Sequence, residues 1–308
     1  MTAVAVVGPT SVGKSALGIW LAEELGGEVV NCDSMQLYRG LDIGTAKTPV
    51  QLRRGIPHHL LDIWDIDYPA NVAEYQHRAR AAIVDIRARG RLPVIVGGSG
   101  LYLRALIDDL RFPGTDPAIR ERWEDVLQRF GSEHLHQELA LRDPEAAALI
   151  LPSNGRRLVR ALEVVEMTGS FTASLPRGGG YLRCAQLGLR ASADWLDERI
   201  RLRTDEMFAG GFVAEVESLR RRGLDATPTA SRALGYREVG QLLDGVLTED
   251  EARSAITVAT RRFARRQYRW FRRDDRVRWL DVDDLEDPRA AALSALAELG
   301  VLADRSAG

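Results

Sequence analysis

Cysteine is scarce in this sequence, and so are long apolar runs. The 308 residues include only two cysteines, Cys32 and Cys184, and five histidines that lack the spacing of a metal site. So few cysteines exclude a disulfide framework and a cysteine-based zinc site, and they fit a reducing cytosol. No apolar stretch approaches the ~20 residues that a membrane-spanning helix needs. The first apolar strand begins at residue 3, which leaves no room for a signal peptide, so we expect a cytoplasmic protein without a membrane partner.

The chain also lacks a strong net charge. Lysine and arginine number 42 against 44 aspartate and glutamate, and hydrophobic residues make up 45% of the sequence. These values are typical of a globular protein. At 308 residues the chain can bury one large core or two smaller ones, and it contains no internal repeat or low-complexity tract.

A phosphate-binding loop lies almost at the start of the chain. The pattern G-x-x-x-x-G-K-[ST] is met by Gly8, Pro9, Thr10, Ser11, Val12, Gly13, Lys14 and Ser15. An apolar run at 3–7 predicts a strand before this P-loop, and apolar spacing at 16–25 predicts a helix after it. Glycines let the backbone wrap a polyphosphate, the helix N-terminus and Lys14 attract it, and Ser15 is a candidate ligand for Mg²⁺. The sequence therefore predicts binding of a diphosphate or a triphosphate, ATP included.

One part of an ordinary P-loop nucleotide hydrolase is missing. In such enzymes a second apolar strand ends in an acidic residue that holds the metal. Here the strand at 92–96 runs into Gly97–Gly100 without a carboxylate, whereas the strand at 28–33 ends in Asp33. Because the carboxyl ends of parallel strands line the ligand crevice, Asp33 and Ser99 are expected to face the P-loop. The loop alone leaves open which phosphate compound binds.

Strands and helices alternate along the first third of the chain. This order predicts an α/β fold with a P-loop NTPase-like parallel sheet flanked by helices over 1–111. An all-helical insertion is predicted over 112–178, where Asp116-Pro117 and Asp143-Pro144 each place a capping residue before proline. The core then resumes over 179–308. The further elements expected are helices at 72–89, 156–168, 193–222, 231–243 and 249–273, and a strand at 181–189.

Arginine crowds one stretch near the C-terminus. Nine arginines lie there, at positions 261, 262, 265, 266, 269, 272, 273, 276 and 278. On the predicted helix, positions 258, 263, 267 and 270 can face a core, while 261, 265, 269, 272 and 273 form a basic stripe. The stripe either pairs with the acidic residues at 281–287 or contacts a phosphate backbone. Arginine in preference to lysine, with aromatic residues interleaved, favours RNA.

Four segments together closely resemble bacterial tRNA dimethylallyltransferases, enzymes that prenylate an adenine beside the anticodon. They are Gly8–Ser15; Asp33–Tyr38 with Asp42–Lys47; Val96–Tyr102; and Arg232–Arg237. Arg156–Glu163 matches a further family segment. Ser99 stands where many members have threonine, which keeps the hydroxyl.

The resemblance implies a chemistry in which no phosphate is transferred. The P-loop would hold dimethylallyl diphosphate, and the five-carbon group would move to N6 of adenine 37 of tRNA. Asp33 would be the catalytic base that takes a proton from N6. Lys14, Mg²⁺ on Ser15, and Ser99 would stabilise the departing diphosphate. Arg203 matches a family arginine that closes on the diphosphate, although it could instead be a surface arginine.

The resemblance also implies where tRNA binds. Ser34, Met35 and Gln36 would contact the adenine, which must leave its stack to react. The anticodon stem-loop would be contacted by Arg156, Arg157, Arg160, Arg232, Gly235 and Arg237. The insertion would grip the stem, and we expect the enzyme to act as a monomer.

Three other functions are compatible with part of the sequence. A small-molecule or nucleotide kinase uses the same loop and sheet, but it leaves the arginine stripe unexplained. A prenyltransferase acting on free adenine nucleotide needs neither the stripe nor the insertion. An RNA-binding module with a relic P-loop does not account for Asp33 beside an intact loop.

Overall fold

The computed structural model describes residues 3–172 and 180–302. The chain divides into two compact units, one formed by Met1–Asp108 with Gly180–Gly308 and the other by Asp109–Gly179. The sequence predicted an insertion that begins at residue 112, and the smaller unit begins at Asp109. The predicted end of the insertion, at 178, lies outside the described residues.

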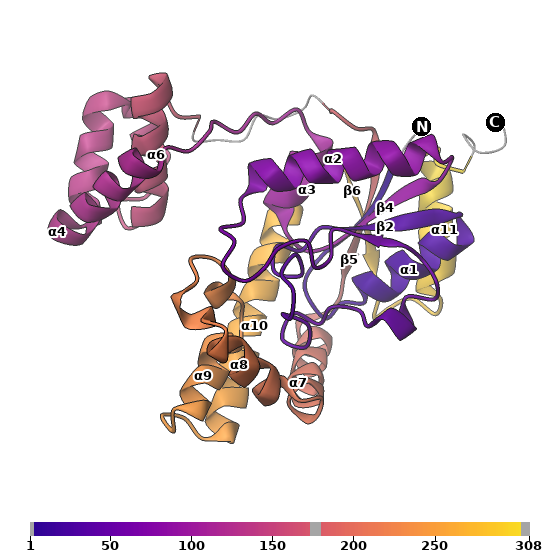
Figure 1. Cartoon of the computed structure of the whole chain (residues 1–308). Coiled ribbons are helices and arrows are strands. Elements are labelled where there is room, and N and C mark those ends of the chain that lie inside the picture. Colours follow the sequence, from indigo (N-terminus) through magenta and orange to yellow (C-terminus); the bar gives the residue numbers. More distant parts are fainter. Residues whose placement is uncertain (1–2, 173–179, 303–308) are drawn as a thin grey trace. The chain divides into compact units, whose positions relative to one another are not determined.

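A six-stranded, all-parallel sheet forms the centre of the larger unit, as the α/β prediction required (Figure 1). Its order is β3-β2-β4-β1-β5-β6. The strands are β1 (Ala3–Val7), β2 (Gly27–Asn31), β3 (His58–His59), β4 (Leu92–Val96), β5 (Cys184–Arg190) and β6 (Val277–Asp281). Val4 of β1 lies opposite Val94 of β4 on one side and Ala185 of β5 on the other. Because β1 is an inner strand, the P-loop that follows it opens at the middle of the sheet's carboxyl edge.

Helices cover both faces of the sheet, so the inner strands β1 and β4 are wholly apolar. One face packs on α1 (Lys14–Glu24) and α11 (Pro288–Glu298), and it receives Val4 and Val6. The other face packs on α2 (Val72–Ala88) and α3 (Gly100–Ile107), and it receives the alternate β1 residues. The period of two in a strand produces this division. The P-loop and α1 therefore start from a rigid, fully buried strand.

A helical subdomain of the larger unit follows β5. It contains α7 (Ala193–Ala209), α8 (Phe212–Arg221), α9 (Tyr236–Leu243) and α10 (Glu249–Phe271), with short 3₁₀ turns at Leu224–Ala226 and Ala230–Arg232. The prediction of one helix over 193–222 was wrong, because Gly211 adopts a left-handed φ of 97° and ends α7. The predicted helix at 231–243 begins only after Gly235, whose φ is 92°.

Two elements at the end of the chain were not predicted. Residues 277–281 form the edge strand β6, and residues 288–298 form α11. In this region the sequence indicated only the acidic residues at 281–287, as possible partners of the arginine stripe. The two-residue strand β3 and a 3₁₀ turn at Val50–Leu52 were also absent from the predicted order of elements. No helix in the described ranges is long and apolar enough to cross a membrane.

The smaller unit is helical, as predicted. It contains α4 (Pro117–Arg142), α5 (Pro144–Ala148) and α6 (Gly155–Thr168), and a kink at Gly131 divides α4. Asp116 and Asp143 cap α4 and α5 as the Asp-Pro pairs indicated. The unit has its own core, which includes Trp123, Leu135, Leu139, Leu158 and Leu162.

Candidate functional site

Glycines give the P-loop its shape. Gly8 has a φ of 136° and Gly13 a φ of 99°, backbone conformations that residues other than glycine rarely adopt. A Cβ on Gly8 would lie 2.4 Å from the carbonyl oxygen of Leu189, so no side chain fits there. Gly13 ends the loop and Lys14 begins α1, which directs the free backbone amides of the helix N-terminus toward the loop's concave side.

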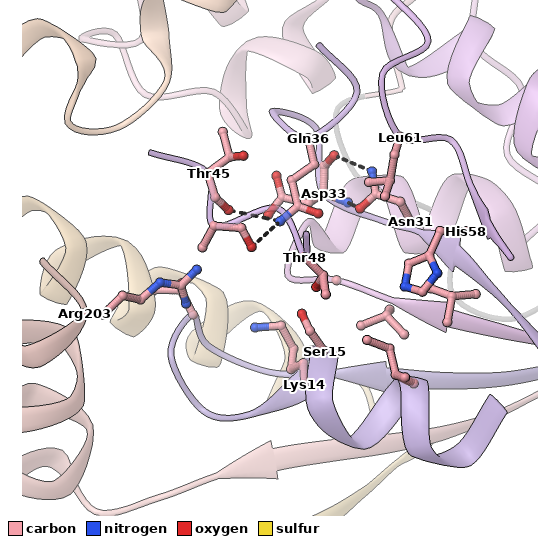
Figure 2. Close-up of a pocket in the computed structure, with 16 residues that line it drawn as sticks. Lys14, Ser15, Asn31, Asp33, Gln36, Thr45, Thr48, His58, Leu61 and Arg203 are labelled. Atoms are coloured by element: carbon pink, nitrogen blue, oxygen red, sulfur yellow. Dashed lines mark hydrogen bonds between the residues drawn. The ribbon is translucent and has the colours of Figure 1, made fainter. Parts of the chain in front are cut away.

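A cavity beside the loop brings together groups from six segments of the larger unit (Figure 2). Asp33 and Gln36 reach it from the turn after β2, and Arg203 reaches it from α7, opposite Lys14. The remaining polar lining is Thr10, Ser15, Asn31, Thr45, Thr48 and His58, and the apolar lining includes Ile19, Val29, Leu61 and Val96. The cavity therefore has a charged end at the P-loop, and polar and apolar side chains share the rest of its lining.

The charged end is set up to receive an anion. The pKa of Lys14 is lowered to about 7, chiefly by burial and also by nearby Arg203, while Asp33 acts in the opposite direction. Burial also lowers the pKa of Arg203, again against the pull of Asp33. Arg203 Nη1 lies 3.5 Å from the Ser11 hydroxyl, so the structure brings this arginine to the P-loop. Two cations share one carboxylate, and a bound diphosphate would supply the missing negative charge.

Asp33 is held by its own turn. Its Oδ1 accepts a hydrogen bond from the Met35 amide at 2.9 Å. The Asn31 side chain accepts from the Asp33 amide and donates to the Asp33 carbonyl, both at 3.0 Å. Asn31 is buried and also donates to the Leu60 carbonyl. The carboxylate thus leaves the carboxyl edge of β2 in a fixed direction, with Lys14 and Arg203 nearby.

Ser99 lies next to this turn. Its hydroxyl accepts a hydrogen bond from the Ser34 amide at 3.3 Å, and its own amide donates to the Cys32 carbonyl. Ser99 therefore ties the end of β4 to the turn that carries Asp33. Of the residues predicted to act beside the P-loop or on the adenine, Asp33 and Gln36 line the cavity, whereas Ser99 and Met35 do not.

The segment Asp42–Lys47 forms a loop over the cavity. Gln36 donates its side-chain amide to the carbonyls of Thr45 and Ala46, at 3.0 and 3.4 Å. Lys47, whose side chain is only 3% exposed, pairs with Asp42 and Asp62 at 2.6 Å and donates to a backbone carbonyl. Lys47 is therefore a structural cation that closes this loop.

Gln267 is a site residue that sequence reasoning missed. It is buried on α10, its Oε1 accepts from the Thr10 amide at 2.8 Å, and its Nε2 donates to the Gly98 carbonyl at 3.0 Å. One side chain thus connects the P-loop with the loop that carries Ser99. The helical spacing placed position 267 toward a core, but no local pattern indicated its two partners.

The buried face of the arginine-rich helix matches the predicted one only in part: Gln267 is buried and Phe263 is half-buried, as expected. Ala252, Ile256, Ala264, Gln267 and Phe271 are the buried positions of α10. Val258 and Trp270 were also expected to face a core, but they are 40% and 42% exposed. The buried face is turned about the helix axis away from these two positions. Arg265 and Arg269 are exposed, as the predicted stripe requires.

The acidic residues at 281–287 have other partners in the structure. Arg261 and Arg265 lie 3.3 and 3.7 Å from Asp197 of α7. Asp281 forms a two-bond ion pair with Arg190, and Asp287 caps α11. The alternative in which the stripe pairs with the acidic segment therefore has no support in these contacts.

The residues predicted to touch RNA differ in their surroundings. Arg232 and Arg237 are exposed around α9, but Gly235 is buried, and a Cβ there would lie 3.1 Å from Phe212. In the smaller unit, Arg156 and Arg157 are exposed on α6. Arg160 pairs with buried Glu163 and donates to the carbonyls of Pro113 and Gly114. Arg160 and Gly235 thus have structural roles within their own units.

The donor atoms fit Mg²⁺ that is shared with a phosphate compound. Ser15 is exposed and lines the cavity together with Asp33, so a hydroxyl and a carboxylate are the hard oxygen ligands available. In the part of the chain that the structure describes, no group of three or more His, Cys, Asp and Glu could hold a metal ion. This partial set suits an ion whose other ligands are water and phosphate oxygens.

Comparisons with known proteins identify the family of this chain. Residues 36–274 match the family model described as IPP transferase. The tRNA dimethylallyltransferase of Salinispora arenicola is 58% identical over 94% of this chain and 87% of its own length. The tRNA isopentenylpyrophosphate transferase of Bacillus halodurans is 39% identical, with a TM-score of 0.73 over 99% of this chain and 98% of that one.

A third relative comes from a eukaryote. A eukaryotic dimethylallyltransferase acting on tRNA gives a TM-score of 0.80 at 25% identity, over 98% of this chain and 80% of that chain. The family model covers more than half of this sequence. The relatives match this sequence over nearly its whole length. The chain belongs to the IPP transferase family.

Proposed function

We propose that this protein transfers the dimethylallyl group of dimethylallyl diphosphate to N6 of the adenine beside the anticodon of tRNA. The products are N6-(dimethylallyl)adenosine and diphosphate. The observation that carries the proposal is the Asp33 carboxylate in one cavity with Lys14 and Arg203, while β4 ends without a carboxylate. A phosphate-binding loop beside a single carboxylate that can accept a proton suits a reaction in which diphosphate is the leaving group. The names of the relatives support tRNA as the acceptor.

The reaction forms a bond between N6 and the allylic carbon and breaks the bond from that carbon to the diphosphate oxygen. Asp33 accepts the proton that N6 loses, because an amine conjugated to a purine is a poor nucleophile. Lys14, Arg203 and the P-loop amides stabilise the charge on the departing diphosphate. Mg²⁺, held by Ser15, would supply further positive charge to the diphosphate when bound.

RNA binding is assigned to arginines on both units. Arg265 and Arg269 lie on the exposed face of α10, and Arg232 and Arg237 are exposed beside α9. Arg156 and Arg157 offer the smaller unit a contact with the anticodon stem. Arginine suits phosphate and splayed bases alike. We propose that the protein acts as a monomer; light scattering with and without tRNA tests this.

The test incubates the protein and Mg²⁺ with labelled dimethylallyl diphosphate and either unmodified tRNA or AMP. Label should enter tRNA only, at adenine N6, as nucleoside analysis by mass spectrometry will show. Transfer to AMP would favour an adenylate prenyltransferase. ATP consumption without prenyl transfer would favour a kinase and overturn the proposal.

A further inference from the structure

The loop Asp42–Lys47 is shaped by a carboxylate from a distant helix. Glu215 of α8 accepts hydrogen bonds from three successive amides of this loop. Its Oε2 accepts from Asp42 and Ile43 at 3.1 and 2.7 Å, and its Oε1 accepts from Gly44 at 3.1 Å. One ionised side chain thus holds the start of the loop as a phosphate is held in a nest of amides.

Aromatic rings complete this attachment. The Tyr236 hydroxyl donates to Glu215 Oε1 at 2.7 Å, and burial together with Glu215 raises the pKa of Tyr236. A Cβ on Gly44 would lie 2.3 Å from Phe212 and 2.6 Å from Tyr236, so the loop backbone rests directly on the two rings. The loop position is therefore determined by α8 and α9 rather than by its own sequence alone.

The far end of the same loop reaches the cavity. The carbonyls of Thr45 and Ala46 hold the side-chain amide of Gln36, and all three residues line the cavity beside Asp33 (Figure 2). Glu215 does not line the cavity. A chain of contacts thus runs from Glu215 through the loop to Gln36, whose amide is fixed in orientation.

We propose that Glu215 is a positioning residue for the acceptor base. It holds the loop so that Thr45 and Ala46 fix the Gln36 amide, which then aligns the adenine with Asp33. This inference rests on the proposed function, since it concerns the acceptor half of the same site. The hydrogen bonds of Glu215 described above go to this loop and to Tyr236, so the P-loop half, which binds the diphosphate, serves as an internal reference.

The test compares Glu215→Gln with Glu217→Gln, an exposed neighbour on α8. Glu215→Gln keeps the shape but places an amide NH₂ against backbone N–H groups. kcat/KM for tRNA should fall about 10- to 100-fold, because a misplacement of about 1 Å costs up to 10² in rate. The dissociation constant of inorganic diphosphate should stay within about twofold, and Glu217→Gln should match the wild type. Wild-type protein that fails to prenylate tRNA would refute the proposed function instead.

A second cycle asks whether Glu215 acts through Gln36. The double variant Glu215→Gln with Gln36→Met should be no slower than Gln36→Met alone. Once the Gln36 amide is absent, Glu215 has no amide left to orient. Tyr236→Phe removes only the phenol donor and should shift kcat/KM in the same direction by less, which covers the case in which Glu215→Gln folds poorly. Multiplying effects in the double variant, or an equal decrease in diphosphate affinity, would overturn the positioning role.

Discussion

Lys14 lies between charges of opposite sign at the charged end of the cavity. Its pKa is lowered to about 7 without a ligand, whereas a bound diphosphate would raise it. In the ligand-free protein Lys14 is thus about half protonated near neutral pH. In the diphosphate complex it stays protonated to higher pH. Binding must therefore take up a proton above that pH, and this coupling is testable.

We expect the affinity for inorganic diphosphate to fall by up to about tenfold per pH unit above pH 7, because binding takes up one proton. Calorimetry at pH 8 in buffers of different ionisation enthalpy measures this uptake. Lys14→Arg is the matched control, since arginine is always charged and titration of the ligand alone would remain. Equal proton uptake by both proteins would show that Lys14 does not titrate on binding.

Asp33 has both a structural and a chemical role, which two substitutions separate. Asp33→Asn keeps the acceptor for the Met35 amide but cannot take a proton, so kcat should fall by about 10²–10⁴ with tRNA affinity nearly intact. Asp33→Ala should disrupt the turn as well and weaken tRNA binding. Single-turnover kinetics with labelled substrate gives both quantities. Asp33→Asn with more than about a tenth of the wild-type rate would remove Asp33 as the base.

At the scale of elements, α10 links the exposed arginine stripe to the P-loop. Gln267→Leu leaves the Thr10 amide and the Gly98 carbonyl without this partner. Removal of such buried pairing costs about 1–3 kcal/mol, part of which should appear as weaker binding of diphosphate. Arg266→Gln, next to it and exposed, should leave diphosphate affinity unchanged. Calorimetry on both variants decides, and identical affinities would reduce Gln267 to a packing residue.

Local patterns predicted the elements that have strong local signals. The strand at 92–96 matched to the residue, and α2 and α6 matched within a residue, because apolar periodicity and capping agree there. β6 was missed because it is a short edge strand with charges at Arg278 and Asp281. α11 carries the same Asp-Pro start as α4, at Asp287-Pro288, so its signal was present in the sequence.

The site divides in the same way. The P-loop and Asp33 follow from local spacing, and the rule on carboxyl strand ends places them together. Gln267 contacts Thr10 across 257 positions of sequence, and Glu215 contacts Ile43 across 172. Nothing in the local sequence around Gln267 or Glu215 encodes these partners, because they are set by how α8 and α10 pack. Such residues become visible only in the folded chain.

At the scale of the whole molecule, a net charge of −2 conceals a basic surface. Arg265, whose side chain is 66% exposed, lies on the outer face of α10, and Asp197 offers it only a distant pair at 3.7 Å. A solvent-exposed pair of this kind contributes little and is screened by salt. Arg265 can therefore exchange Asp197 for an RNA phosphate at small cost.

The arginine stripe predicts how tRNA binding depends on salt. Changing Arg265 and Arg269 to Gln should flatten the plot of log affinity against log salt by about one unit for each phosphate that the protein no longer neutralises, because fewer counterions are released. Diphosphate affinity should not change, since the P-loop is intact. Arg91→Gln is the matched control, because this exposed arginine precedes β4 at the opposite edge of the sheet from the site. Fluorescence anisotropy with a labelled anticodon stem-loop over a salt series measures each slope. If the slope of the double variant equals that of the control, α10 does not contact the RNA backbone, and binding must rest on Arg156, Arg157, Arg232 and Arg237.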